Sequence, residues 1–365
     1  MPSVRQHIGD VYAAGIEYLS RRIFCHRIPP LIALTLALST VALTQNQTST
    51  LIRDGQAALD AGDFARAAHD FEQARSLAPD NKEVQRGLLL SDLQLGRLDD
   101  AQNIGEAAVG RWPQDAELQH WLGLVYFKKS QNTDALAALQ RSEALDATHY
   151  DIHFDLALVL LSDSNYAQAA DELEKAAKLD SKAALGHVLL GRAYQNTNRT
   201  LQAVEQFKIA LRLEPGIPLG HYHLGFAYAS LGRNREAILE YQKELDQASS
   251  NPSVLYQLGH CELEAGEWDS AVEHLKKATE IDPVNADAFY DLGKARLLQG
   301  DAESAMPALR RSIALKPSNP TPHYQLARAL EKAGKKEEAK QELETFATLK
   351  KAQPVTGGMA AGPVQ

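Results

Sequence analysis

The sequence predicts an all-α protein, a solenoid of stacked antiparallel helix pairs, and three observations support this fold class. A 34-residue pattern that starts at Thr48 recurs nine times in register without an insertion. Within each copy, apolar residues recur with the i, i+3, i+4, i+7 spacing of an amphipathic helix. Turn dipeptides such as Gly62-Asp63 and Gly232-Arg233 then divide copies into two helical stretches.

Four positions of the repeat carry the pattern most clearly. Position 7 is Leu in eight copies and position 8 is Gly or Ala in eight, while Pro closes five copies at position 32. Small residues such as Gly225 and Ala237 let two antiparallel helices approach closely, and the closing Pro ends the second helix. Position 20 is Ala in all nine copies: Ala67, Ala101, Ala135, Ala169, Ala203, Ala237, Ala271, Ala305 and Ala339.

One such helix pair cannot bury its own apolar stripe. Stacking the pairs buries the stripe between neighbours and produces a curved surface suited to binding. Four residues depart from the pattern, and we expect a structural consequence from one of them, Pro307. Glu244 replaces a small residue in the sixth repeat, and Pro307 falls early in the second helix of the eighth, where it should delay or kink that helix. Asp54 and Gly105 replace the expected Leu and aromatic residue in the first two repeats.

This spacing resembles the tetratricopeptide repeat, whose signature has Leu-Gly, then Tyr, later Ala, an aromatic residue and Pro. The repeat over residues 184–217 shows the whole pattern: Leu190-Gly191, Tyr194, Ala203, Phe207 and Pro215. The resemblance covers residues 48–353. It implies a right-handed superhelical solenoid of antiparallel helix pairs, in which the first helix of each pair lines a concave groove that binds a protein or peptide.

The period also fixes the expected domain organisation. We expect a leader over residues 1–47 with an apolar run over 31–43, nine repeats over 48–353, and a flexible tail over 354–365. The nine repeats are 48–81, 82–115, 116–149, 150–183, 184–217, 218–251, 252–285, 286–319 and 320–353.

The leader predicts export. Arg21, Arg22 and Arg27 precede the run LIALTLALSTVAL, which has the length of a secretory signal core and is too short to span a bilayer as a helix. If the run is not cleaved, it would serve as a membrane anchor. We therefore expect an exported, periplasmic or envelope-associated protein. A buried helix docked on the body, and a cytoplasmic protein, are the alternatives.

Composition restricts the partners. Residues 1–47 carry a net charge of +2, so residues 48–365 carry −11 of the total of −9. Phosphate neutralisation needs clustered Lys and Arg, which the chain lacks, so nucleic acid is not expected as a partner. The two cysteines, Cys25 and Cys261, form no disulfide framework.

The stretch GHYHLGFAY at residues 220–228 looks at first like a metal site. His221 and His223 point about 200° apart on a helix, so they cannot bind one metal ion together. His221 also occupies position 4 of its repeat, which is His at 153, 187 and 323, while Leu255 and Phe289 fill the position in the two repeats between His221 and His323. Exchange of His for Leu and Phe indicates packing within the helix pair, with no carboxylate supplied at that position. His223 belongs to the opposite side.

We expect the groove to be lined by the side of the first helices that carries His223. Its candidate contact residues are Trp121, Phe154, Arg192, Tyr222, His223, Phe226, Tyr256, His260, Tyr290, Lys294, Tyr324 and Arg328. Position 5 gives a tyrosine row, Tyr222, Tyr256, Tyr290 and Tyr324, spaced by 34 residues. Such a row is typical of peptide-contacting surfaces, although the same tyrosines could simply pack between neighbouring first helices.

No sequence motif indicates catalysis. A Gly-rich phosphate loop, HExxH, CxxC and Gly-x-Ser-x-Gly are all missing, so we predict no catalytic, cofactor-binding or metal-binding residue and no cofactor. The Lys/Asn clamp with which some members of the family hold a peptide carboxylate is also missing from positions 5 and 9. The expected function is a non-enzymatic scaffold that binds an extended peptide or a partner helix in its groove. The alternative is an envelope assembly factor, for a secretion or polysaccharide machine, that uses its convex surface and terminal repeats.

Overall fold

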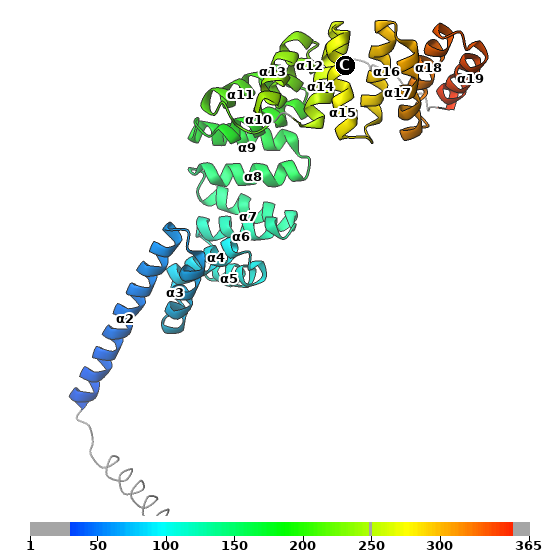
Figure 1. Ribbon diagram of the computed structural model, residues 1–365. Helices are drawn as coiled ribbons and strands as arrows, with labels where there is room; N and C mark the ends of the chain where they lie inside the picture. The colour runs from blue at the N-terminus through cyan, green and yellow to red at the C-terminus, as the bar shows by residue number, and fades with distance from the viewer. Residues whose placement is uncertain (1–29, 248–249, 353–365) are drawn as a thin grey trace, which may run out of the picture. The chain divides into compact units, whose positions relative to one another are not determined.

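The computed structural model describes residues 30–247 and 250–352, and these residues form 18 α-helices and no strand (Figure 1). Contacts divide the chain into two compact units, Met1–Asp146 and Ala147–Gln365. The arginines of the predicted leader and the predicted tail over 354–365 lie outside the described residues.

Within each unit the helices follow one another as antiparallel pairs. The first unit holds α2 (Pro30–Asp60), α3 (Phe64–Leu77), α4 (Lys82–Leu95), α5 (Leu98–Arg111), α6 (Ala116–Lys128) and α7 (Asn132–Leu145). The second holds α8 (Tyr150–Ser162), α9 (Tyr166–Leu179), α10 (Ala184–Asn196), α11 (Thr200–Leu213), α12 (Gly220–Ser230), α13 (Asn234–Gln247), α14 (Pro252–Ala265), α15 (Trp268–Ile281), α16 (Ala286–Gln299), α17 (Ala302–Leu315), α18 (Pro320–Lys332) and α19 (Lys336–Ala352). The predicted all-α solenoid of helix pairs is confirmed.

Helix α2 joins the apolar run to the first repeat. It continues without a break from Pro30 to Asp60, so residues 31–43 and the first repeat share one helix. Across the part of the chain that the structure describes, no helix has the length and hydropathy that crossing a membrane requires. Export and anchoring through this run stay predictions.

The turn inside each helix pair has the same backbone geometry throughout. Position 15 has a positive φ in all nine repeats, between 59° and 90°. Glycine, which adopts this region without steric cost, fills six of these positions, as the Gly-Asp and Gly-Arg dipeptides predict. Ser130, Ser164 and Asn198 take the same conformation as non-glycine residues, at a cost of roughly 1–2 kcal/mol each.

The helix pairs close on the small residues that the sequence pattern predicts. The Ala at position 20 is buried in every repeat. Gly191 at position 8 lies against Phe207 at position 24, so closely that a Cβ on Gly191 would be 2.5 Å from the ring. Gly225 meets Tyr241 in the same way, and its Cβ would be 2.9 Å from that ring. Close approach of the two backbones is therefore what selects glycine at position 8 in these repeats.

Pro307 does not delay its helix. Helix α17 begins at Ala302, caps its first turn with the Asp301 side chain, and continues through Pro307 to Leu315. The prediction of a delayed helix is wrong, and the alternative of a kink stays a prediction. Met306 and Ala308 on either side of the proline are buried, and the packing of this segment holds the helix together across the missing N–H donor.

The first helices form the inner side of each unit. Besides contacting its own partner, α4 contacts α2 and α6 in the first unit, and α12, α14 and α16 each contact the first helices before and after them in the second. No pair of second helices from neighbouring repeats makes comparable contacts among the described residues. First helices are therefore closer together than second helices, which makes their side the concave one.

Candidate functional site

The inner face is the row of first-helix side chains at positions 2, 5, 6 and 9 of each repeat. Of the 12 predicted contact residues, 11 lie on the first helices of the second unit and Trp121 lies on α6 in the first. Their role in binding stays a prediction.

In the first unit the inner face is hollowed. A cavity of about 1150 Å³ is lined by α2, α4 and α6, with Ile52, Arg86, Glu117 and Trp121 among its walls. The Arg86 guanidinium lies 5.4 Å from the centroid of the Trp121 ring, in a cation–π arrangement, and forms an ion pair with Glu117. Sequence reasoning identified Trp121 but missed Arg86, whose pairing with Trp121 depends on how α4 lies beside α6.

In the second unit the tyrosine row is only partly exposed. Tyr222, Tyr256 and Tyr290 are half-buried, while Tyr324 is 42% exposed. Tyr256 and Tyr290 pack against the apolar core, and the Tyr324 ring lies 5.4 Å from that of Phe346 on α19. Burial raises the pKa of Tyr222 and of Tyr290 above the usual value, so both phenols are neutral at physiological pH. The row therefore packs against the apolar core with one edge and leaves the other partly exposed.

His223 is built into an aromatic cluster. Its ring stacks on Phe207 at 5.6 Å and meets the Tyr222 ring edge-on at 5.5 Å. Burial, with a smaller contribution from the Arg192 charge, lowers the pKa of His223 to about 4. The imidazole is thus neutral at pH 7 and presents an aromatic surface rather than a charge.

Polar side chains dominate the inner face from α14 to α18, and most of them already have partners. His260 Nδ1 is 2.8 Å from the buried Asp291 carboxylate, and that hydrogen bond raises the pKa of His260. Lys294 Nζ donates to Glu264 at 2.8 Å, and Arg328 donates to Gln325 Oε1 at 3.1 Å. This end of the face is a closed hydrogen-bonded network.

The inner face from α8 to α12 is more apolar. Phe154 on α8 is half-buried and stacks on Tyr150, with ring centroids 5.3 Å apart, and Phe226 on α12 is 40% exposed. Arg192 on α10 is exposed, and the structure gives its guanidinium no ion pair or hydrogen bond with any described residue. An unpaired cation thus lies on an apolar stretch of the inner face.

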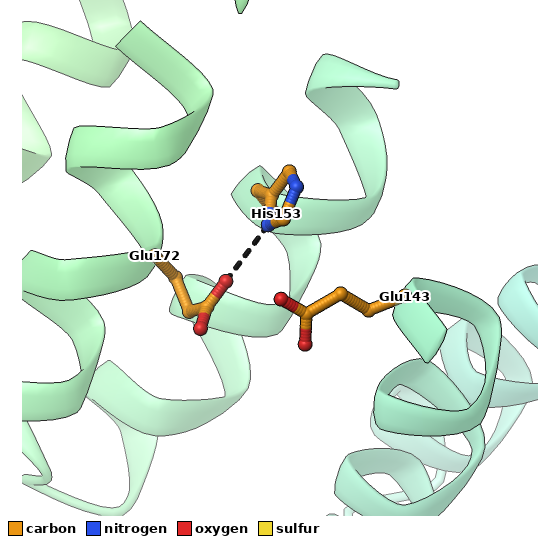
Figure 2. A group of neighbouring side chains, drawn as sticks. All are labelled: Glu143, His153 and Glu172. Atoms are coloured by element: carbon orange, nitrogen blue, oxygen red, sulfur yellow. Dashed lines mark hydrogen bonds and ion pairs between the residues drawn. The ribbon is translucent and has the colours of Figure 1, made fainter. Parts of the chain in front are cut away.

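The histidines at position 4 pack inside the helix pairs, as predicted, but their hydrogen bonding was missed. Figure 2 shows His153 Nδ1 on α8 facing the Glu172 carboxylate on α9 at 2.8 Å; Glu143, also labelled there, belongs to the first unit. His221 pairs with Glu240 at 2.6 Å and His323 with Glu342 at 2.5 Å. His187 meets the Gln206 amide oxygen at 2.7 Å.

The expectation that no carboxylate serves this position is therefore wrong. Each partner lies 19 residues after its histidine, at position 23 on the second helix, and this spacing recurs in four repeats of the second unit. The 19-residue separation is present in the sequence. It predicts a hydrogen bond only when the two helices are known to lie side by side. These contacts are hydrogen bonds between the two helices of one repeat.

One buried polar atom near the inner face has no partner. Tyr241 is fully buried between α12 and α13, and its hydroxyl makes no hydrogen bond to any described residue. Position 24 is otherwise filled mainly by Leu and Phe, so no hydroxyl is required there.

Tyr241→Phe is expected to raise the free energy of unfolding by about 1 kcal/mol, because it removes a buried hydroxyl that lacks a hydrogen bond. Chemical denaturation of the full chain measures this. Tyr194→Phe is the matched control: that hydroxyl donates to Glu174 at 2.7 Å, so its loss should cost about 1 kcal/mol. A loss of stability in Tyr241→Phe comparable to that in the control would show that the Tyr241 hydroxyl has a partner after all.

Fold and inner face together define a solenoid of helical-hairpin repeats. Profiles of tetratricopeptide repeat families match residues 58–123 and 296–347, 188–252, and 262–300, and together cover more than half of the chain. A profile described as anaphase-promoting complex, cyclosome, subunit 3 matches residues 94–176. The chain belongs to the tetratricopeptide repeat family, and this repeat supports a role in protein interaction.

Parts of this chain are similar to solved structures. One is YrrB, a tetratricopeptide repeat protein with an unusual peptide-binding site: 24% identity, 51% of this chain and 96% of that chain covered, TM-score 0.47. MamA from Desulfovibrio magneticus has 18% identity, with 47% and 96% covered and a TM-score of 0.44. The Cut9–Hcn1 hetero-tetramer of the anaphase-promoting complex has 20% identity, with 73% and 52% covered and a TM-score of 0.48. At such identities and TM-scores, these likenesses say nothing about the ligand of this chain. Comparison with curated proteins gave no significant match.

Proposed function

We propose that the chain is a protein-interaction scaffold whose second unit binds an extended peptide or a partner helix along the inner face of its first helices. The observation that carries this proposal is the mixture of side chains on that face. Exposed Phe226 and Tyr324 lie on the same row of helices as half-buried Tyr222, Tyr256 and Tyr290. Aromatic rings of this kind supply contact area at low entropic cost, and their hydroxyls give direction to hydrogen bonds.

The outer surface offers a less coherent alternative. Leu201 on α11 and Leu239 on α13 are more than half exposed, at 67% and 57%. They occupy different positions of their repeats, so they do not form a row along the second helices. Isolated exposed leucines are common on soluble proteins and need no partner to explain them.

Substituting the exposed aromatic residues tests the inner face. Phe226→Ala with Tyr324→Ala is expected to reduce recovery of partner proteins, in pull-downs from the native host with the full chain as bait, by at least tenfold. Tyr222, Tyr256 and Tyr290 changed together to Ala should have a similar effect. However, half-buried side chains also stabilise the fold, so that variant is interpreted only if its circular dichroism and melting temperature match the wild type.

The matched control removes exposed apolar area from the outer surface. Leu201→Ala with Leu239→Ala should leave recovery unchanged. If the outer-surface variant loses its partners and the inner-face variant keeps them, the inner face is not the binding surface, and an adaptor that works through its convex side becomes the better description.

A further inference from the structure

One part of the inner face differs from the rest in a way that points to a ligand. Leu185 and Arg192 lie seven residues apart on α10 and so share a helix face, while Leu219 immediately precedes α12 and lies seven residues before Phe226 on that helix. Because α10 contacts α12, we group these four side chains as one patch. We call Leu185, Arg192, Leu219 and Phe226 the corner patch.

Three of the four residues of the corner patch are apolar and exposed. Leu185 is 53% exposed, and Leu219 and Phe226 are each 40% exposed. At position 2, where these two leucines stand, the other four repeats of the second unit carry the polar residues Asp151, Ser253, Asp287 and Thr321. At position 2 of the second unit, exposed apolar side chains are therefore confined to these two neighbouring repeats.

The fourth residue of the corner patch, Arg192, is a cation with no acidic partner among the described residues. Lys294 and His260, which share position 9 with Arg192, are paired with Glu264 and Asp291. Arg192 has no such carboxylate among the described residues, and its neighbour His223 is neutral at pH 7. A guanidinium flanked by apolar side chains binds a carboxylate in a bidentate geometry, and more strongly than in open water because the local dielectric is lower.

Leu219 is also held in an unfavourable backbone conformation. It precedes α12 with φ 60° and ψ 12°, the left-handed region, which costs a non-glycine residue roughly 1–2 kcal/mol. Glycine or asparagine would adopt this conformation more readily. Leu219 thus holds a large apolar side chain, 40% exposed, in a backbone conformation that favours glycine, which leaves part of that side chain available for contact with a ligand.

We propose that the corner patch recognises a peptide segment in which an Asp or Glu that pairs with Arg192 lies within about three residues of two apolar side chains. The spacing follows from the patch: seven helical residues span about 10 Å and neighbouring helices lie about 10 Å apart, a distance that three extended residues cover. The proposal deepens the proposed function and rests on it. The charge of −11 on residues 48–365 disfavours phosphate-rich partners such as nucleic acid.

A phage-displayed library of random 12-residue peptides, selected on the full chain, tests this specificity. Selected peptides are expected to carry one Asp or Glu beside apolar residues. Arg192→Gln should weaken binding of a synthetic selected peptide at least tenfold by fluorescence anisotropy, and should remove most of its dependence on salt. Arg212→Gln, which removes an exposed charge from α11, is the matched control and should bind as the wild type does.

Leu219→Gly separates binding from stability. It should weaken the peptide several-fold while leaving the melting temperature equal to or above that of the wild type, because backbone strain is relieved. Ser164→Gly relieves the same positive φ in a turn away from the corner patch, and should keep full affinity.

The outcomes distinguish the two proposals. Selected peptides without an acidic residue, or undiminished binding by Arg192→Gln, overturn the corner-patch specificity while leaving an inner-face scaffold intact. Failure to select any peptide whose binding depends on an inner-face residue overturns both.

Discussion

Phe207→Ala is expected to lower the free energy of unfolding by about 3–5 kcal/mol, the largest effect of any single change considered for this chain. The ring is fully buried between α10 and α11, where it lies on the bare backbone of Gly191 and stacks on His223. Truncation leaves a cavity that the glycine opposite cannot fill. Because each repeat contacts only its neighbours, destabilisation should concentrate in the fifth and sixth repeats. Chemical denaturation of the full chain measures the loss, and hydrogen exchange locates it.

Phe207→Leu is the matched control, because Leu fills the same position in several other repeats, at Leu139, Leu173, Leu275 and Leu309. It should cost less than about 1.5 kcal/mol. A second control tests the fit between the ring and Gly191. Gly191→Ala should cost about 1–3 kcal/mol with Phe207 present and much less in the Phe207→Leu background, which gives a measurable coupling energy.

The natural repeats support this coupling. Where position 24 is aromatic, at Phe71, Phe207 and Tyr241, position 8 is glycine, and where position 8 is alanine, at 157 and 327, position 24 is leucine. If Gly191→Ala costs the same in both backgrounds, the close approach of the two helices is not what selects glycine here, and the pattern is coincidental.

The sequence was sufficient for those features that local periodicity determines. Alanine at position 20 predicts a close approach of two helices, and glycine at position 15 predicts a left-handed turn. The structure has both features. That Ser130, Ser164 and Asn198 adopt the same turn as glycine follows only from their register, since none of them requires a positive φ by itself. Register can therefore override the local preference of a residue.

Features that depend on two helices were harder to predict. To predict the pairing of His221 with Glu240, one must know how far α12 and α13 are shifted along each other. To predict the pairing of Arg86 with Trp121, one must know that α4 contacts α6. The tyrosine row illustrates the same limit. The 34-residue spacing places Tyr290 and Tyr324 on the inner face, but whether a ring is half-buried or exposed depends on the neighbouring repeat.

Glu244 departs from the repeat pattern, and the structure gives a reason for this residue. Helices α4, α6, α14, α16 and α18 each begin with an Asn or Asp whose side chain accepts a hydrogen bond from the first turn. Helix α12 begins after Leu219, which offers no such acceptor. Glu244, buried at the end of α13, reaches across the pair, and its carboxylate accepts a hydrogen bond from the Tyr222 backbone N–H at 3.1 Å. The missing cap is thus supplied by the second helix of the same repeat.

Glu244→Ala is accordingly expected to lower the free energy of unfolding by about 2–3 kcal/mol, because it removes a charge-assisted hydrogen bond and leaves a helix N-terminus without an acceptor. Native-state hydrogen exchange gives the most direct measurement: the Tyr222 amide should lose protection in this variant. Glu244→Gln keeps an oxygen that can accept the same hydrogen bond, and should cost less than about 1 kcal/mol.

The same substitution should also weaken ligand binding, since fraying of the first turn of α12 displaces Leu219 and Tyr222 together. At position 27, where Glu244 stands, Ser142 and Ser312 instead donate to the carbonyl oxygens of Ala116 and Ala286 at the start of the first helices of their repeats. Glu244→Ser should therefore fold, yet be too short to reach the Tyr222 N–H, and should resemble alanine in amide exchange. If the Tyr222 amide stays protected in both variants, Glu244 does not cap α12, and another group must hold the start of that helix in place beside the corner patch.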